Sequence, residues 1–449
     1  MKQRLSFERV WWIALAIKCL IAAVVPLSND EAYYWVWGHH PQLSYFDHPP
    51  FVGWLFSIGT IFDFASPGLS LVRWPGVILG HATLLIWNSI LRPYLTESQR
   101  KLWLIFIVVS PLIGIGSIII TPDIPLVFFW SLSLLLLINL IQTPKLSLYA
   151  GLGAALGLGF CSKYLIVIFV PIALLWLAIS GEWRKVRWAY VPATIVTGLI
   201  FCAPVLIWNY QNDWASFAFQ LSHGLEAEKH EWNWPLEYLG AQIALLFPPV
   251  IYFALKRKED PRLRFLHYFG WLPLAFFFYT SFKARVEANW PIMAYPAILS
   301  LAFLNASEKS VRRIAWIWAA VMSIALSEAI FQWIPMDPTK LKTREHTRYD
   351  FVLPELTPDT YLASYQMAAT ISYRTQTPYY KLDGLNRRDF YDFIPQSHPT
   401  TDKFRVISER YNRLPTWTKT GYKVVNRVPL DGERYRLFEV VRDAQDADR

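Results

Sequence analysis

Long apolar runs separated by short polar segments constrain this chain more than any other feature of its sequence. Runs such as Val10–Leu27, Leu102–Ile120 and Val191–Trp208 are long enough, at about 1.5 Å per residue, to cross a hydrocarbon layer of roughly 30 Å. The composition agrees, because 54% of the 449 residues are hydrophobic and only 17% are charged. The chain is therefore predicted to cross a membrane many times, which excludes an ordinary soluble domain.

The apolar runs predict about eleven membrane-spanning helices. They cover approximately residues 10–27, 72–91, 102–120, 124–141, 147–162, 165–180, 189–208, 238–255, 266–281, 291–306 and 314–334. After Pro335 the runs shorten, and the pattern predicts strands over 359–365, 404–409, 422–428 and 434–441 and helices over 367–372 and 387–393. The predicted domains are a mainly α membrane domain, 1–334, with a first outer loop over 28–71, and a small α/β domain, 335–449.

The basic residues predict the orientation, since lysine and arginine favour the cytoplasmic side of a membrane. Eighteen basic residues lie in the terminus and loops on one side, against only Lys163, Lys229, Lys283 and Arg285 in the opposite loops before residue 335. We expect the N-terminus inside and the C-terminal domain outside. The net charge of +9 then reflects topology and attraction to anionic lipids, and it does not indicate nucleic acid. Three cysteines, all within predicted spans, offer no disulfide framework outside.

The polar residues that could carry chemistry all lie at the outer ends of predicted spans, as in an enzyme that works at a bilayer surface. They occur in six segments: Ser28–Glu31, Tyr45–Pro50, Thr121–Asp123, Ser162–Tyr164, Ser222–Gly224 and Lys283–Glu287.

The first outer loop holds two of these segments and no lysine or arginine, and its aromatic residues predict amphipathic helices in the headgroup layer. Asp30 and Glu31 directly follow the first span, where a carboxylate needs a hydroxyl, a cation or a metal to offset its desolvation. Alternatively, Asp30 or a serine caps a helix that begins near Ala32. Asp47 and His48 precede two prolines and could bind a divalent metal, share a proton or cap a helix.

The remaining segments also have two interpretations. Asp123 closes a turn or caps a helix, and Lys163 either extends to lipid headgroups or contacts a phosphate. The loop that contains His223 mixes polar and aromatic residues, which suits carbohydrate contact or an interfacial loop. Lys283 and Arg285 lie where positive charge is otherwise scarce, which favours a phosphate ligand.

These motifs together resemble the bacterial members of the protein mannosyltransferase-like group of GT-C glycosyltransferases, which includes the lipid A aminoarabinose transferases. The resemblance covers about residues 10–300. It rests on Asp30-Glu31, Tyr45-Phe46-Asp47-His48-Pro49-Pro50, Thr121-Pro122-Asp123, Gly159-Phe160-Cys161-Ser162-Lys163-Tyr164 and Asn289-Trp290-Pro291, in this order.

The resemblance implies a polytopic, inverting transferase that moves one sugar from a polyprenyl-phosphate carrier, such as undecaprenyl phosphate, to an acceptor hydroxyl or phosphate on the outer face. By position, Asp30 matches the family's catalytic acidic residue, the general base. Its motif neighbour Glu31 is the second expected catalytic residue, as a partner that supports Asp30. At Asp47-His48 the aminoarabinose transferases have an acidic residue followed by lysine, so histidine here favours a metal or hydrogen-bond role over phosphate binding. The expected substrate-binding residues are Asp47, His48, Asp123, Lys163, Tyr164, His223, Lys283, Arg285, Glu287 and Asn289, among which Lys163, Lys283 and Arg285 bind the donor phosphate and Glu287 pairs with Arg285.

The expected location is the inner membrane of a bacterium, with the active site and the C-terminus in the periplasm and lipid A or another lipopolysaccharide component as the acceptor. No cofactor is required, although Asp47, His48 and His223 could hold a divalent metal. Three other functions fit parts of the pattern: a protein O-mannosyltransferase-like enzyme, a flippase for lipid-linked sugars, and a ligase that transfers a whole glycan. A flippase would need charges within the spans, where Lys18 is essentially alone. A ligase would need more phosphate-binding cations, which Arg344, Arg348, Arg387 and Arg388 could supply.

Overall fold

The computed structural model describes residues 5–225, 231–337 and 340–443, and the chain divides into two compact units. The first, termed the helical unit, comprises Met1–Ala22, Gln42–Leu55 and Arg73–Leu326. The second, termed the sheet unit, comprises Ala23–Pro41, Phe56–Val72 and Ser327–Arg449. The sheet unit takes in two segments of the first outer loop, which the predicted division into 1–334 and 335–449 assigned to the membrane domain.

The helical unit contains the long apolar helices, and each of the eleven predicted spans falls on one helical segment or on two consecutive ones. Its helices are α1 (Phe7–Val24), α4 (Trp74–Leu91), α5 (Glu97–Val108), α6 (Asp123–Gln142), α7 (Leu146–Ser162), α8 (Phe169–Ser180), α9 (Val191–Gln211), α10 (Ala215–Leu225), α11 (Trp234–Leu246), α12 (Pro248–Ala254), α13 (Phe265–Thr280), α14 (Tyr295–Asn305) and α15 (Glu308–Phe331). Helix α3 (Phe51–Gly59) begins in this unit and ends in the sheet unit, and the last residues of α1 and α15 also belong to the sheet unit.

Not every helical segment has the length and composition of a membrane span. In the described residues, four helices are long and apolar enough to cross a membrane, and the number rises to seven if each of three bent helix pairs is one span. Two of these pairs bend before a proline: α5 and the turn over Pro111–Ile118 meet at 78°, and α11 and α12, which begins at Pro248, meet at 87°. The structure therefore supports a polytopic membrane fold, while the count of eleven spans stays a prediction.

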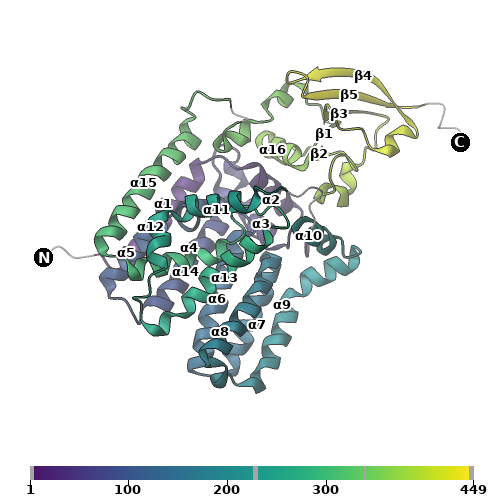
Figure 1. The fold of residues 1–449 in the computed structure, drawn as a ribbon. Coiled ribbons are helices and arrows are strands. Elements are labelled where there is room, and N and C mark those ends of the chain that lie inside the picture. Colours follow the sequence, from purple (N-terminus) through teal and green to yellow (C-terminus); the bar gives the residue numbers. More distant parts are fainter. Residues whose placement is uncertain (1–4, 226–230, 338–339, 444–449) are drawn as a thin grey trace. The chain divides into compact units, whose positions relative to one another are not determined.

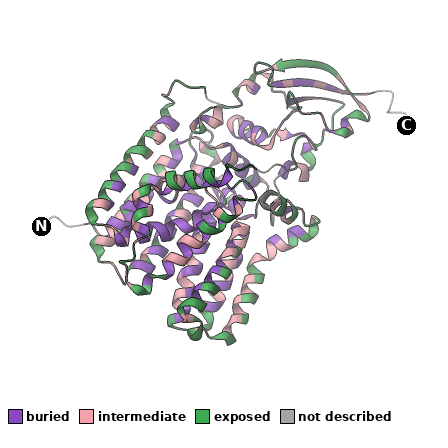
Figure 2. Ribbon diagram, in the orientation of Figure 1, coloured by how far each residue is buried: buried purple, intermediate pink, exposed green. Residues whose placement is uncertain are grey.

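Glycines let α7 and α9 pack closely in the helical unit. Helix α7 lies beside both α6 and α9 (Figure 1), and a Cβ atom at Gly153 would approach the carbonyl oxygen of Thr194 to 2.1 Å. Small residues allow such approach between apolar helices, and polar side chains then bond across the interface. Thr194 does so, because its hydroxyl donates to the carbonyl oxygen of Tyr149 at 2.9 Å. Figure 2 shows few buried residues along α9, as expected of a helix that faces lipid.

The sheet unit carries a five-stranded sheet of order β2-β1-β3-β5-β4. Its strands are β1 (Thr360–Leu362), β2 (Tyr380–Lys381), β3 (Lys403–Glu409), β4 (Tyr422–Leu430) and β5 (Tyr435–Arg442). Strand β1 is parallel to β2 and β3, whereas β5 is antiparallel to β3 and β4. The predicted strands are confirmed, and β2, with only two residues, is the one that the sequence pattern missed.

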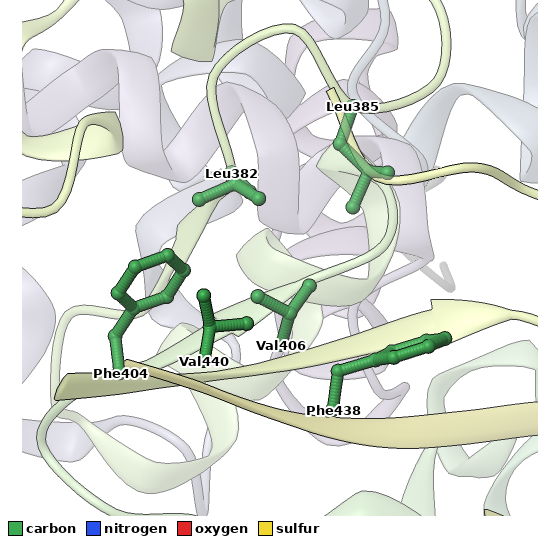
Figure 3. Packing of buried hydrophobic residues seen from close by; sticks show 6 residues of the cluster. All are labelled: Leu382, Leu385, Phe404, Val406, Phe438 and Val440. Atoms are coloured by element: carbon green, nitrogen blue, oxygen red, sulfur yellow. The ribbon is translucent and has the colours of Figure 1, made fainter. Parts of the chain in front are cut away.

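Apolar residues at alternate positions of the strands form the core of this sheet. Phe404 and Val406 of β3 stand opposite Val440 and Phe438 of β5, so all four side chains point to one face. Leu382 and Leu385, from the loop after β2, face them across the core (Figure 3). All six side chains are buried, with exposed fractions of 0–8%.

Two helices accompany the sheet. Helix α16 (Tyr365–Thr375) confirms the helix predicted over 367–372, whereas the helix predicted over 387–393 is only a 3-10 turn over Phe390–Phe393. Helix α2 (Asn29–His39) comes from the first outer loop, and nine of its eleven residues are buried. The prediction that this helix lies in the headgroup layer is wrong, because its aromatic residues pack inside the protein, notably against α16.

Candidate functional site

Asp123, Lys163 and Asn289 meet in the helical unit as one polar group. Asp123 is the first residue of α6, Lys163 directly follows α7, and Asn289 lies between α13 and α14. The Nζ atom of Lys163 is 2.6 Å from Oδ1 of Asp123, and Nδ2 of Asn289 donates to Oδ2 of Asp123 at 2.5 Å. The side chains of Asp123 and Lys163 are only 4% and 13% exposed.

In this group, termed the Asp123 triad, Lys163 retains N–H donors that Asp123 does not use. Both oxygens of Asp123 have partners, so its buried charge is compensated. An ammonium group has three N–H donors, and Lys163 directs one of them to Asp123. The triad therefore holds a cation in place with further donors for an anion, which is the chemistry of a phosphate ligand.

The segment after Lys163 and the segment around Asp47 are both anchored within the same unit. The hydroxyl groups of Tyr164 and Ser216 lie 2.9 Å apart, which ties the segment after α7 to α10. The carbonyl oxygen of Asp47 accepts a hydrogen bond from Gln220, also in α10. The carboxylate of Asp47 is buried, and the neighbouring His48 is partly buried. Residues from two distant segments of the sequence are thus held by α10.

The segment Lys283–Glu287 does not join the triad but lies on the surface of the helical unit. Lys283 packs its ammonium 5.1 Å from the ring centre of Tyr279. Arg285 is 3.8 Å from Glu237, and their side chains are 69% and 46% exposed. The structure thus pairs Arg285 with Glu237, whereas the sequence suggested Glu287, an exposed residue two positions away.

An apolar groove runs along α7, α8 and α9 of the helical unit. Its volume is about 660 Å³, and its walls include Leu152, Phe160, Ile166, Leu174 and Leu199. Leu174 and Leu199 are more than half exposed, so the groove opens to the surroundings of the helices. Phe160 and Ile166 flank the triad's lysine in the sequence, at positions three before and three after it. The groove therefore has an end close to a fixed cation.

Asp30 lies at the start of α2 in the sheet unit, and it is half-buried. The cap of this helix is Ser28, whose hydroxyl accepts from the backbone N–H of Glu31 while the Glu31 carboxylate accepts from the backbone N–H of Ser28. Helix α2 therefore begins at Asn29, three residues before the predicted start at Ala32. Asp30 has no capping role, since the neighbouring Glu31 supplies the carboxylate of this capping box.

Two side chains from the C-terminal region bond to the start of α2 within the sheet unit, and a third pairs with one of them. Gln366 Nε2 donates to Asp30 Oδ1 at 2.9 Å, and Glu345 Oε1 accepts from the backbone N–H of Asn29 at 3.1 Å. Lys342 Nζ lies 2.5 Å from Glu345 Oε2. Desolvation lowers the pKa of Lys342, but the carboxylates of Glu345 and Asp30 raise it above its ordinary value. Asp30 is therefore within electrostatic reach of a surface cation.

The structure does not test the metal site that the sequence suggested. In the described part of the chain, no group of three or more His, Cys, Asp or Glu side chains is arranged to hold a metal ion. His223 belongs to α10, but its side chain lies outside the described residues. A metal at Asp47, His48 and His223 stays a prediction.

The fold is that of a polytopic membrane protein, and comparison with known proteins shows which family it resembles. The sequence model of the family described as dolichyl-phosphate-mannose-protein mannosyltransferase matches residues 47–208, which contain Asp47, Asp123 and Lys163. These residues thus match the model of this family, and the resemblance that the motifs indicated is confirmed.

Two curated relatives sharpen this assignment. The chain is 24% identical over 299 residues to the lipid A galacturonosyltransferase RgtD of Rhizobium johnstonii, which covers 61% of this chain and 59% of that protein. It is 26% identical over 328 residues to the undecaprenyl phosphate-alpha-4-amino-4-deoxy-L-arabinose arabinosyl transferase 2 of Pseudomonas fluorescens, with 64% and 57% covered. The chain therefore spans less than two thirds of the length of either relative.

Among solved structures, the chain resembles ArnT from Cupriavidus metallidurans bound to undecaprenyl phosphate. The TM-score is 0.63 and the identity 14%, over 96% of this chain and 97% of that one. A likeness at this identity shows the fold, and it agrees with the predicted GT-C architecture, with its helices and its small C-terminal sheet.

The sequence contains a signal for one feature of the site and none for another. The pattern Ser28-Asn29-Asp30-Glu31 is a capping box, and its spacing could have located the start of α2. Gln366 gives no such signal, because it is one polar residue in an amphipathic helix, 336 positions from Asp30. Only the fold reveals that contact.

Proposed function

We propose that this protein transfers a single sugar from a polyprenyl-phosphate carrier to an acceptor on the periplasmic face of a bacterial inner membrane. The observation that carries the proposal is the apolar groove beside the Asp123 triad, since a polyprenyl phosphate combines a long apolar chain with an anionic head. Burial of the chain would supply affinity at roughly 25 cal/mol per Å² of apolar surface removed from water. Lys163 would bind the phosphate.

In this proposal Asp30 is the general base. It accepts the proton of the acceptor's hydroxyl group while the acceptor oxygen forms a bond to the anomeric carbon of the sugar. The bond between that carbon and the phosphate oxygen breaks, and its electron pair leaves with the phosphate, whose charge Lys163 stabilises. A single displacement of this kind inverts the configuration at the anomeric carbon.

The other predicted site residues have supporting roles. Asp123 and Asn289 hold Lys163, and Tyr164 anchors the segment that follows it. Lys283 and Arg285 are exposed, so their role is to attract the anionic headgroups of donor and acceptor over a longer range. Glu31 stabilises the start of α2 and does not take part in the chemistry.

Lipid A, or another lipopolysaccharide component, is the proposed acceptor. Support comes from the two relatives, one a lipid A galacturonosyltransferase and the other an undecaprenyl phosphate-alpha-4-amino-4-deoxy-L-arabinose arabinosyl transferase. Donor and acceptor would both reach the protein through the membrane, which agrees with a groove that opens to the surroundings of the helices.

The test is transfer by the purified full-length protein in lipid nanodiscs. The probes are undecaprenyl phosphates carrying galacturonic acid, aminoarabinose or mannose, each combined with lipid A or with a serine- and threonine-rich peptide. We expect glycosylated lipid A from at least one donor. Product on the peptide alone would overturn the proposed acceptor, and donor movement across proteoliposomes without any product would support a flippase instead.

A further inference from the structure

The first turn of α2 is held by one face of α16, and both helices belong to the sheet unit. Gln366 donates to Asp30, and Thr370, one helical turn later, donates from its hydroxyl to Oδ1 of Asn29 at 2.9 Å. Residues four apart lie on the same side of a helix. Two consecutive residues of α2 are therefore fixed by two side chains of α16.

Helix α16 is a rigid support for these contacts. Seven of its eleven residues, Met367–Tyr373, are buried, and Ser364 caps its start by accepting from the backbone N–H of Met367 at 3.2 Å. Aromatic rings lock the two helices together, with Tyr33 and Tyr365 at 4.5 Å between ring centres and Trp35 and Tyr373 at 5.3 Å. A side chain that projects from α16 thus has a defined position relative to α2.

The contact leaves part of the Asp30 carboxylate available. Gln366 bonds to Oδ1, and the second oxygen, Oδ2, has no hydrogen bond from the described residues. The donor is a neutral amide, which orients the carboxylate without forming a close ion pair with it. A base needs this combination, namely a fixed direction and an oxygen free to accept a proton.

We propose that Gln366 is a positioning residue for Asp30, so that the C-terminal α/β region contributes directly to the geometry of catalysis. The inference rests on the proposed role of Asp30 as the general base. Gln366 turns Oδ2 of Asp30 toward the acceptor hydroxyl and does not itself contact the reacting atoms. The C-terminal region then helps to position the catalytic base.

The decisive experiment is a double-mutant cycle of Asp30→Asn and Gln366→Met in the full-length protein in nanodiscs. Methionine has nearly the volume of glutamine but no N–H donor, so the packing of α16 is retained. We expect Gln366→Met to lower kcat roughly 10- to 100-fold, with the KM for the donor within about twofold, because misplacement of a catalytic group affects the transition state. In the Asp30→Asn background, Gln366→Met should cause no further loss.

Two further variants serve as a second test and as a control. Gln366→Glu preserves shape but places a second carboxylate against Asp30, and it should lower kcat at least as much as Gln366→Met. Thr375→Val is the matched control on α16, since Thr375 donates its hydroxyl to the carbonyl oxygen of Ile371 within the same helix at 2.8 Å. We expect kcat within about twofold of wild type for this control, because it leaves the groups that meet Asp30 unchanged.

The outcomes separate this inference from the proposed function. Wild-type kcat in both Gln366 variants, or an additive loss in the Asp30→Asn background, would overturn the positioning role while leaving Asp30 as the base. Full turnover in Asp30→Asn alone would instead overturn the proposed base. If Gln366→Met does not fold, as judged by thermal unfolding, the same comparison is made with Gln366→Glu.

Discussion

Asp123 in the helical unit and Asp30 in the sheet unit are both carboxylates in the first turn of a helix, but their surroundings differ. Asp123 is buried, and an ammonium group and an amide take up its two oxygens. Asp30 is half-buried, and a neutral amide takes up one oxygen. The first carboxylate is compensated for charge, whereas the second is oriented but retains an accepting atom.

This difference decides which of the two can act as a base. A carboxylate that already forms a close ion pair loses that stabilisation when it takes up a proton, so Asp123 suits the fixing of Lys163. Asp30 can accept a proton through Oδ2 without breaking the bond from Gln366. Substitutions in the Asp123 triad should therefore affect stability and donor binding, and substitutions around Asp30 should affect turnover.

The largest expected effect follows from Lys163→Met, which removes the cation of the Asp123 triad. A buried carboxylate left without its partner costs about 3–5 kcal/mol of stability, and donor phosphate binding should be lost as well. Thermal unfolding and titration with undecaprenyl phosphate in nanodiscs measure the two effects.

The control for this variant is the double substitution Lys163→Met with Asp123→Asn, which removes both charges. We expect it to recover much of the unfolding temperature but none of the donor binding. Recovery of donor binding would show that Lys163 is not the phosphate ligand and that the pair serves stability alone.

A smaller effect is expected from Leu174→Trp, which narrows the apolar groove of the helical unit. Leu174 is 53% exposed, so the larger ring should change the free energy of unfolding by less than about 1 kcal/mol. The KM for an undecaprenyl-phosphate donor should rise roughly tenfold, since one crowded apolar contact is worth 1–3 kcal/mol. A donor with a short prenyl chain is the control substrate, and its KM should change less than that of the undecaprenyl-phosphate donor. An equal rise in KM for both donors would show that the groove does not hold the polyprenyl chain.

The smallest effect is expected from Arg285→Ala. Its pair with Glu237 is long and largely exposed, so its loss should cost less than about 1 kcal/mol of stability. Donor binding should weaken a few-fold at low salt, and the difference should vanish at high salt because exposed charges are screened. A tenfold or greater loss that persists at high salt would indicate direct phosphate contact, which would bring Arg285 into the site beside Lys163.

The sequence predicted the helical segments well because a segment that crosses a bilayer must form all its backbone hydrogen bonds internally, which requires a long apolar helix. It did not predict the bends before Pro111 and Pro248, so helices that looked continuous are broken. The four longer strands were predicted from their alternation, whereas β2 escaped because two residues show no period. The prediction was thus right where a long apolar run or a repeated alternation gives the signal.

The candidate site was predictable only in part for the same reason. Topology indicated that Asp123, Lys163 and Asn289 share one side of the membrane, but nothing in the sequence joins the three into a triad. The capping box of Ser28 and Glu31 was a local signal that separates Glu31 from Asp30. The contact from Gln366 depends on the packing of α16 against α2, which no local pattern encodes.

The most direct test of the central claim compares Asp30→Asn with Glu31→Gln, two neighbouring carboxylates that become amides. For Asp30→Asn we expect turnover at least 100-fold below wild type, with donor affinity and unfolding temperature nearly unchanged, because general base catalysis contributes about 10²–10⁴-fold and the new amide oxygen still accepts from Gln366. For Glu31→Gln we expect turnover close to wild type and a lower unfolding temperature, since this side chain supports the cap. Near wild-type turnover in Asp30→Asn would contradict the account.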